Sequence, residues 1–334
     1  MALTERVRWG VIAATARVAR DYTIPAIMNS DKAELVAVAS RNLTNAQEIA
    51  SGLDICRAYG DYDSLIADHS VEAVYIPLPN NLHVGWAVEA MNNGKHVLCE
   101  EPLAVTAAES MEMLETSQDN GVLLSEAMMY YYHPLQSAVE DVIRSGRIGK
   151  VSLVKASVSC LQHDQDDHRF NAQMGGGSLL DVGCYCVHIA RKAFGSEPTS
   201  VTAHSEIDPE SKVDTTTTAQ LIFPSGLAMI DCSFSMANRS TYEIVGTEGS
   251  ITVPLVFVAS DMPGEFVVNR TGEPSETVRT AACDMFAAEI DQFSSAVRTL
   301  PNRLLGPEDA VANMVVLDAI ASSARSERQV SIPG

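Results

Sequence analysis

Residues 9–27 read WGVIAATARVARDYTIPAI, a short apolar run that leads directly into a helical pattern. A β-strand that opens into a helix near the start of a chain can hold a phosphate group against the helix N-terminus. Such a turn usually carries the pattern G-x-G-x-x-G. With the helix anchored on residues 17–19, the three glycine positions fall on Ala14, Ala16 and Ala19. The stretch therefore indicates a dinucleotide site without glycines, and the alternative is a tight turn that binds nothing.

Alanine narrows this turn without removing the backbone amides at the helix N-terminus. The third glycine position needs only close helix packing, so alanine is acceptable there. An arginine beside the turn could add a charge-assisted contact to a phosphate. We expect the turn to hold the cofactor through Ala14, Thr15, Ala16, Arg17 and Val18.

The end of the second expected strand, residues 34–39, bears on which dinucleotide is bound. An acidic residue at this place accepts the ribose hydroxyl groups of NAD, whereas an arginine accommodates the 2′-phosphate of NADP. The residues here are Ser40 and Arg41, and neither is acidic. We expect NADP as the cofactor, with NAD possible. The alternative is that Arg41 is a solvated cap of the next helix.

The first 125 residues alternate short β-branched runs with amphipathic helical patterns, which is typical of a parallel sheet built from βαβ units. Thr106 is the expected N-cap of one helix and Gly121 its stop signal. The fold class is therefore α/β, with an N-terminal doubly wound sheet of the Rossmann type. The expected strands are 7–13, 34–39, 74–76, 96–99 and 122–124. Two expected helices end at residues 29 and 52, and two others span residues 82–93 and 106–120.

After residue 150 longer β-rich runs follow one another at hairpin spacing, which predicts a C-terminal α+β domain with a large, mainly antiparallel open sheet. We place the domains at 1–125, for the dinucleotide, and 126–334, for substrate and oligomer contacts. The last helix, 307–326, can pack back on the first domain. The expected strands are 150–159, 200–205, 215–223, 227–234, 241–245, 250–253 and 265–269, and the other helices are 178–194 and 282–298.

Composition narrows the classes of partner. The 334 residues include 43 acidic and 23 basic side chains, a formal net charge of −20, which repels phosphate backbones and anionic lipids. We expect no nucleic-acid or membrane partner and a cytoplasmic location. The seven cysteines are dispersed and odd in number, which favours buried free thiols over disulfides. Cys184 and Cys186 are spaced too closely for a structural zinc pair, so no metal site is expected.

Three further segments, with the first turn, carry a family resemblance: PLPNNLH at 77–83, GKHVLCEEPLA at 94–104 and GGGSLLDVGCY at 175–185. The chain resembles the Gfo/Idh/MocA oxidoreductases over nearly its whole length. The likeness is greatest to the branch that holds dimeric dihydrodiol dehydrogenase and the NADP-dependent D-xylose 1-dehydrogenases. It implies hydride transfer between the nicotinamide and a carbon of a sugar, polyol or related substrate, and a homodimer or higher oligomer formed through the C-terminal sheet.

The resemblance also assigns residues to the cofactor cleft. The two prolines of residues 77–79 fix a turn, and Asn80 could simply cap the next helix. That capping role is the alternative to cofactor contact. The residues expected at the cofactor from the resemblance are Pro77, Leu78, Asn80, His83, Glu100 and Pro102.

Asp181 and Tyr185 are four residues apart on an expected helix and so lie on one face. In the related branch the tyrosine exchanges a proton with the substrate oxygen, and the aspartate orients substrate or tyrosine. The resemblance places Arg169 on the substrate side. Tyr130, which follows the last strand of the first sheet, and His188, three residues after Tyr185, are expected there from their positions. The alternatives are surface residues on a helix, a solvated loop around Arg169, and aromatic residues that fill the seam between domains. Relatives also tend to carry an arginine where Tyr131 stands.

Glu101 stands where the family motif Glu-Lys-Pro has its lysine. That ammonium is expected to contact the nicotinamide ribose and the reacting oxygen, and to lower the pKa of the tyrosine. At an effective dielectric near 20, one unit charge about 4 Å away contributes roughly 4 kcal/mol. Three interpretations stay open: Glu101 is an acid/base group of an enzyme with altered chemistry, it marks a non-catalytic ligand-binding or partner protein, or Arg17 or Arg169 pairs with it.

Overall fold

The computed structural model describes residues 5–162 and 164–332, which form two compact units. Of the described residues, 5–132 and 284–311 belong to the first unit, and those of 133–283 and 312–332 belong to the second. The chain therefore leaves the first unit at Tyr132 and returns to it at Asp284. The domain division at residue 125 expected from the sequence stays a prediction, and the units are described separately below.

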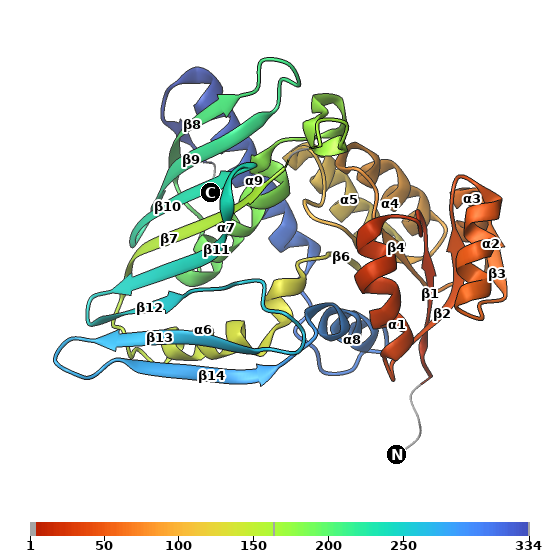
Figure 1. Cartoon of the computed structure of the whole chain (residues 1–334), viewed down its shortest axis with the longest axis horizontal. Helices are drawn as coiled ribbons and strands as arrows, with labels where there is room; N and C mark the ends of the chain where they lie inside the picture. The colour runs from red at the N-terminus through yellow and green to blue at the C-terminus, as the bar shows by residue number, and fades with distance from the viewer. Residues whose placement is uncertain (1–4, 163, 333–334) are drawn as a thin grey trace. The chain divides into compact units, whose positions relative to one another are not determined.

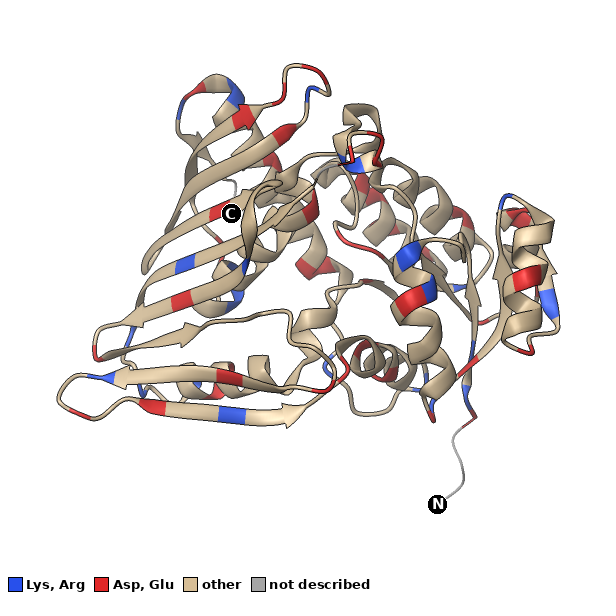
Figure 2. Cartoon of the chain, viewed as in Figure 1, with Lys and Arg blue, Asp and Glu red and all other residues tan. Residues whose placement is uncertain are grey.

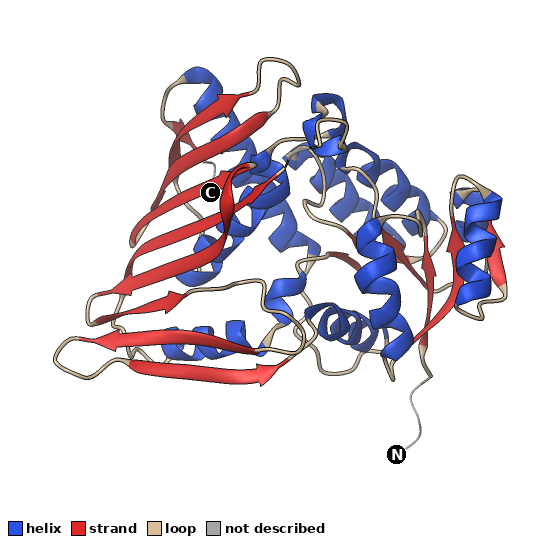
Figure 3. Ribbon diagram, viewed as in Figure 1, coloured by secondary structure: helices blue, strands red, loops and turns tan. Residues whose placement is uncertain are grey.

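A six-stranded parallel sheet forms the centre of the first unit, with the strand order β3-β2-β1-β4-β5-β6 (Figures 1 and 3). This is the strand order of doubly wound dinucleotide-binding domains, in which the direction of winding reverses between β1 and β4. The expected Rossmann-type α/β sheet is confirmed. The strands are β1 (Val7–Val11), β2 (Ala33–Ala39), β3 (Arg57–Tyr59), β4 (Ala73–Ile76), β5 (His96–Cys99) and β6 (Leu124–Glu126).

Helices cover both faces of this sheet. One apolar cluster joins one face to the inner sides of α3 (Tyr62–Ile66), α4 (His83–Asn92) and α5 (Ala107–Asn120). A second cluster joins the other face to α1 (Ile24–Asn29), α2 (Leu43–Gly52) and α8 (Met285–Val297). Burial on both faces explains why β4 is continuously apolar and does not alternate.

Helix α8 comes from far along the chain yet belongs to the core of the first unit. The Trp9 ring of β1 lies 5.0 Å from the Phe293 ring, and the Trp9 indole N–H donates to Ser294 Oγ at 3.2 Å. Ser30 Oγ donates to Asp291 at 2.5 Å. The amphipathic pattern predicts this helix, but the pattern does not say which sheet it covers.

Helix α5 ends where the sequence predicts. Thr106 accepts from the Glu109 amide, and the Glu109 side chain accepts from the Thr106 amide, which completes a capping box. Gly121 closes the helix with a φ of 64°, a left-handed conformation that glycine adopts without strain. The strand expected at 122–124 is displaced to β6, Leu124–Glu126, because residues 121–123 form the turn after this cap.

A nine-stranded mixed sheet dominates the second unit, in the order β14-β13-β12-β11-β7-β10-β9-β8-β15. All its pairs are antiparallel except β7 with β10, so the expectation of a large, mainly antiparallel sheet is confirmed. The strands are β7 (Val151–Leu161), β8 (Ser200–Ile207), β9 (Asp214–Phe223), β10 (Gly226–Ser233), β11 (Ser235–Gly246), β12 (Gly249–Val253), β13 (Pro263–Arg270), β14 (Glu276–Ala282) and β15 (Val330–Ser331).

Three helices pack on this sheet. Helix α7 (Cys184–Phe194) lies against β7 and β10, and α6 (Pro134–Arg144) lies against β13 and β14. In α9 (Pro307–Ser326), the Ser323 hydroxyl accepts from the amide of Ala203 in β8. The helix expected at 178–194 begins as a π-helical turn, η6 (Leu179–Gly183), and continues as α7.

Charged residues are spread over the helices, strands and loops of both units (Figure 2). Across residues 5–162 and 164–332, none of the helices combines the length and apolar character that a membrane crossing requires.

Candidate functional site: the ends of the first sheet and the start of helix α7

The turn after β1 bends at Ala13, which has a φ of 46° and is buried. The Ala14 amide donates to the Ala39 carbonyl at 3.0 Å, and the Ala16 amide donates to the Ala13 carbonyl at 2.8 Å. These two amides are thus occupied within the chain. Thr15 and Arg17 are exposed at the same turn, and Val18 is partly buried. The exposed residues are therefore the better placed of the expected phosphate contacts.

Arg17 lies beside an acid of its own helix. Its guanidinium is 3.9 Å from the Asp21 carboxylate, and its side chain is 81% exposed. An ion pair this exposed contributes little to stability, so the guanidinium can turn toward an incoming anion at low cost.

The end of β2 presents an exposed cation. Ser40 is buried and its hydroxyl accepts from the Asn42 amide at 3.4 Å. Asn42, and not Arg41, is the N-cap of α2, since its side chain accepts from the Thr44 amide at 2.9 Å. The alternative of Arg41 as helix cap is therefore wrong. Arg41 is exposed and lies close enough to lower the pKa of Tyr62, which burial raises.

His83 joins two loops at the carboxyl edge of the sheet. It is fully buried, with Nε2 2.7 Å from the Leu78 carbonyl oxygen and Nδ1 3.0 Å from the Pro102 carbonyl oxygen. One loop follows β4 and the other follows β5, so the ring fixes the spacing between them. Pro77 is buried, and Asn80 opens a 3-10 turn, η2 (Asn80–Leu82).

Glu100 and Glu101 follow β5 at the same edge. The Glu100 amide donates to the Ile76 carbonyl at 3.2 Å, and the Tyr75 hydroxyl donates to the Glu100 carboxylate. Glu101 is partly buried, and its peptide bond to Pro102 is cis.

Two further acids, which the sequence does not single out, complete this region. Glu126 at the end of β6 is 2% exposed and accepts from the Leu103 amide at 2.7 Å. Glu289 of α8 is 1% exposed, and its Oε1 has no hydrogen-bond partner among the described residues. Burial raises the pKa of Glu289 well above its ordinary value of 4.5, and the nearby Glu101 and Glu126 raise it further. We call Glu101, Glu126 and Glu289 the acidic corner.

Replacing Glu289 by glutamine is expected to change how stability depends on pH. Glu289 binds its proton more tightly in the folded than in the unfolded chain, so the native protein loses stability as pH rises above 4.5 toward the raised pKa. The glutamine variant lacks this loss. Relative to the native protein, it should gain about 1–3 kcal/mol in unfolding free energy between pH 5 and pH 8.

Urea unfolding followed by tryptophan fluorescence measures this difference, because both tryptophans, Trp9 and Trp86, lie in the first unit. The exposed Glu112→Gln variant of α5 is the control and should track the native protein at both pH values. If the free energies of unfolding of the native and Glu289→Gln proteins change with pH in parallel, Glu289 is ionised in the folded protein.

A cation from elsewhere in the first unit lies beside the aromatic segment that follows β6. The Arg303 guanidinium lies 5.2 Å from the centre of the Tyr131 ring and donates to its hydroxyl at 3.4 Å. A positive charge thus lies beside Tyr131, where the family resemblance leads us to expect an arginine. Tyr130, expected on the substrate side, is 2% exposed.

In the second unit, Arg169 and Asp181 form a direct ion pair. Arg169 Nε donates to Asp181 Oδ1 at 2.8 Å, and Arg169 Nη1 donates to Asp167 Oδ1 at 3.3 Å. Burial raises the pKa of Asp181, and the guanidinium opposes that rise. Arg169 is therefore held against the π-helical turn η6, and the alternative of a solvated loop fails at Arg169, whereas residues 164–166 of the same loop are exposed.

The glycines before η6 are required by this packing. Gly177 has a φ of 120°, and a Cβ there would collide with the Asp214 carboxylate. Asp214 Oδ2 accepts from Ser178 Oγ and from the Leu179 amide, both at 2.7 Å. Asp214, which sequence reasoning misses, thus anchors the start of the segment that carries Asp181 and Tyr185.

Tyr185 and His188 are buried on α7. Tyr185 is 4% exposed, and its ring meets Phe257 edge to face with centroids 4.9 Å apart. His188 is 0% exposed. The alternative of Asp181 and Tyr185 as surface residues of a helix therefore fails for Tyr185.

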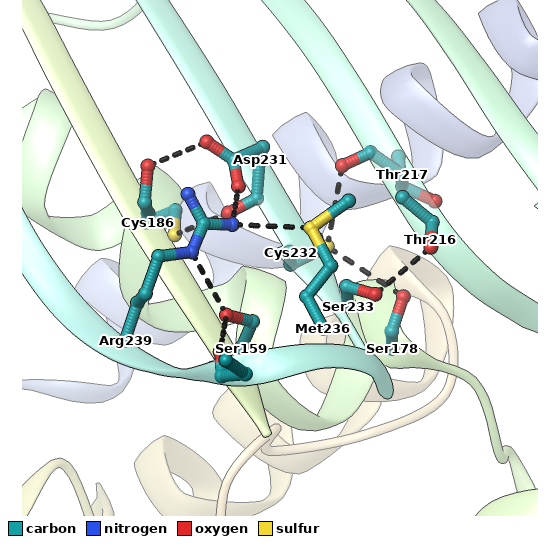
Figure 4. A network of polar contacts seen from close by, with 12 residues as sticks. Ser159, Ser178, Cys186, Thr216, Thr217, Asp231, Cys232, Ser233, Met236 and Arg239 are labelled. Carbon is teal, nitrogen blue, oxygen red and sulfur yellow. Dashed lines mark hydrogen bonds and ion pairs between the residues drawn. The ribbon is translucent and has the colours of Figure 1, made fainter. Parts of the chain in front are cut away.

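A polar network fixes the sheet beneath this helix (Figure 4). A register shift in β11 lets Arg239 cross β7, where its Nε donates to Ser159 Oγ at 3.0 Å, and pair with Asp231 of β10. The Cys186 thiol of α7 contacts the Asp231 carbonyl at 3.6 Å. The network thus ties α7 to the three central strands.

The site residues expected from the sequence fall into two groups, one in each unit. The first unit holds the turn after β1, the end of β2 and the loops after β4 and β5 at one edge of its sheet, as parallel strands require. The second unit joins Arg169 to Asp181 and places Tyr185 four residues further along. Sequence signals for the missed acids exist: Glu289 lies within the apolar stripe of α8, and Glu126 ends a fully buried strand.

Comparisons with known proteins agree with this architecture. Residues 7–128 match the oxidoreductase family with an NAD-binding Rossmann fold, and residues 137–252 match the Gfo/Idh/MocA C-terminal domain. An uncharacterized oxidoreductase of Rhizobium meliloti is 37% identical over 95% of this chain and 97% of its own length. The NADP-dependent D-xylose 1-dehydrogenase 2 of Haloferax volcanii is 34% identical over 96% and 98%.

One solved structure is especially informative. A 3-ketoreductase from Actinomadura kijaniata, in complex with NADP and TDP-benzene, superposes with a TM-score of 0.89 at 28% identity over 96% of this chain and 98% of that one. A variant of it with a lysine replaced by glutamate, also in complex with TDP-benzene and NADP, gives a TM-score of 0.86 at 27% identity over the same shares. Family models match both units, and two relatives are more than 30% identical over nearly the full length of the chain. These matches show that this chain belongs to the Gfo/Idh/MocA family of oxidoreductases.

Proposed function

We propose that this protein is an NADP-dependent oxidoreductase that acts on a hydroxyl or carbonyl group of a sugar, a polyol or a related compound. The observation that carries the proposal is the exposed Arg41 at the end of β2, at the position where an acid would favour NAD. The NADP-dependent relative at 34% identity and the NADP complex of the 3-ketoreductase support the same cofactor.

The residues present fit a bound dinucleotide. Thr15 and Arg17 are exposed at the turn after β1, where a pyrophosphate meets this fold, and Arg41 is exposed where a 2′-phosphate would lie. The loops after β4 and β5 are held at a fixed distance by His83, which preforms the other half of the site. When bound, the cofactor supplies a hydride or accepts one at its nicotinamide ring.

In the second unit, we assign Tyr185 as the acid/base group for the substrate oxygen and Asp181 as the group that orients substrate or tyrosine. Arg169 holds Asp181 in place through the 2.8 Å bond, and this contact favours a charged pair over a neutral acid. His188, three residues after Tyr185, lies one turn further along the same helix. Arg169 and His188 complete the proposed substrate side.

The second candidate function follows from the carboxylate at position 101. Without a cation at that position, the chain could bind nucleotide or sugar without turnover, as a ligand-binding or partner protein. The glutamate variant of the 3-ketoreductase keeps NADP and TDP-benzene, so a carboxylate in place of a lysine is compatible with cofactor binding in this fold. This favours an enzyme with an altered site over a protein that has lost its cofactor.

Titration with NADPH and with NADP⁺, followed by turnover assays on aldoses, polyols and keto sugars, tests the proposal. Nucleotide binding with substrate-dependent turnover supports the enzyme. Binding without turnover on any substrate class supports the ligand-binding protein. No binding near millimolar nucleotide contradicts the oxidoreductase and supports the non-catalytic protein.

Replacing Arg41 by alanine is expected to weaken NADPH binding by about 10- to 100-fold, because the 2′-phosphate loses charge-assisted hydrogen bonds. NADH lacks that phosphate, so its dissociation constant should change by less than about twofold. Arg144→Ala, which removes a 72% exposed guanidinium on α6, is the matched control. Equal losses for NADPH and NADH would place Arg41 away from the 2′-phosphate.

We further propose that the open sheet of the second unit mediates a homodimer or higher oligomer. Leu227 and Met229 of β10 are 38% and 52% exposed on the sheet, which is unusual for neighbouring apolar side chains of one strand face. Light scattering should give at least twice the chain mass, and Met229→Glu should shift it toward the monomer. A monomeric native protein at high micromolar concentration would contradict the proposal.

A further inference from the structure

The acidic corner lies at a defined place on the first sheet. Glu101 follows β5 and Glu126 ends the neighbouring strand β6, where it accepts at 2.7 Å from the Leu103 amide, two residues after Glu101. Glu289 of α8 is close enough for both carboxylates to raise its pKa. Among the described residues, the charged groups that act on Glu289 are the carboxylates of Glu101 and Glu126. Its Oε1 is buried without a hydrogen-bond partner in that part of the chain. The corner therefore brings three acids together, and one of them has a buried acceptor atom that the described residues leave unused.

The fold places this corner under one half of a bound dinucleotide. A dinucleotide crosses the sheet at the switch between β1 and β4, with its pyrophosphate at the turn after β1. Its adenosine half lies over β2, where Arg41 is exposed. The nicotinamide half then lies over β4 and the strands beyond it, β5 and β6, whose carboxyl ends carry Glu101 and Glu126.

The two redox forms of the nicotinamide differ in charge. The oxidised ring carries one positive charge, and the reduced ring is neutral. A carboxylate near the ring therefore attracts the oxidised form and has no such attraction for the reduced form. The buried setting strengthens the effect, because solvent screens it less than at the surface.

We propose that the acidic corner makes this protein bind the oxidised nicotinamide dinucleotide more tightly than the reduced one. The inference rests on the proposed function. It is a property of this chain, since a lysine in place of Glu101 would act in the opposite direction.

The preference has a consequence for the reaction. In carbonyl reduction, NADPH gives a hydride to the carbonyl carbon, a proton goes to the oxygen, and NADP⁺ remains. A site that stabilises NADP⁺ shifts the equilibrium of the bound species toward the alcohol and NADP⁺. The corner thus favours carbonyl reduction over alcohol oxidation on the protein, and it makes NADP⁺ release slow.

Dissociation constants for NADP⁺ and NADPH, measured by calorimetry at pH 7.5 on the full chain, test this inference. The native protein should bind NADP⁺ about tenfold or more tightly than NADPH, as one unit charge near the ring requires. Glu101→Gln should reduce that ratio by about tenfold, and Glu101→Lys should invert the preference. Glu112→Gln removes one exposed charge elsewhere on the first unit and should leave the ratio unchanged.

The outcomes separate this inference from the proposed function. Binding of both nucleotides with a ratio that Glu101→Gln leaves within about twofold of the native value overturns the inference and leaves the cofactor assignment intact. Tighter binding of NADPH by the native protein also overturns it. Failure to bind either nucleotide overturns the proposed function itself. Tryptophan fluorescence of Trp9 and Trp86 confirms that each variant is folded in the first unit.

Discussion

Tyr185→Phe is expected to lower kcat by about 10²- to 10⁴-fold while leaving nucleotide binding within about twofold of the native value. The variant removes only the hydroxyl, which we assign to proton exchange with the substrate oxygen. The ring remains, and its edge-to-face contact with Phe257 at 4.9 Å is kept. Loss of activity would therefore report the missing proton donor and not a rearranged helix.

Tyr242→Phe is the matched control for this result. Tyr242 is also a buried tyrosine of the second unit, and its hydroxyl donates to Gln136 at 2.8 Å. Removing it should cost about 1 kcal/mol of stability and leave kcat unchanged. Equal losses of activity in both variants would indicate a general effect on the second unit. Full activity of Tyr185→Phe would exclude the tyrosine as the proton donor.

Local signals predict the parts of this fold in which neighbouring residues in sequence settle the conformation. Helix α5 is an example, because Thr106, Glu109 and Gly121 fix its ends through contacts within a few residues. Strand β4 is predicted for a similar reason. It is buried at every position, so its sequence is a continuous apolar run.

Elements that depend on distant contacts are harder to predict. The three-residue β3 and the five-residue α3 are too short to show a period. Strand β14 is exposed or partly exposed along its length, so it has no apolar alternation and exists through pairing with β13. Helix α6 follows an aromatic run that hides its start at Pro134.

The candidate site likewise contains residues that sequence motifs reveal and residues that only the fold brings together. Glu101 and Tyr185 stand in motifs and can be found in the sequence. Glu289 is marked in the sequence only as an acid within the apolar stripe of α8. The two acids that act on it are more than 160 residues away, and only the fold brings them together. The ion pair between Arg169 and Asp181 likewise depends on the path of the loop between them, which composition describes only as polar.

Glu101→Lys is the second change with a large expected effect, a rise in kcat of about 10- to 100-fold. One unit charge at about 4 Å contributes roughly 4 kcal/mol at an effective dielectric near 20, which corresponds to about three decades of rate. A lysine at this position would stabilise the negative charge that develops on the substrate oxygen. The gain in kcat should be smaller than three decades, because the nearby Glu126 carboxylate would offset part of the new positive charge.

The same glutamate-to-lysine substitution outside the acidic corner provides the control. Glu112→Lys makes an equal change of charge on the exposed side of α5 and should leave kcat within about twofold of the native value. A rise in kcat for Glu101→Lys alone would show that the native carboxylate limits turnover at the reacting atoms. An unchanged kcat would show that residue 101 lies away from the nicotinamide. A fall would show that Glu101 is itself an acid/base group, so that the chain catalyses its reaction with a carboxylate where its relatives use an ammonium.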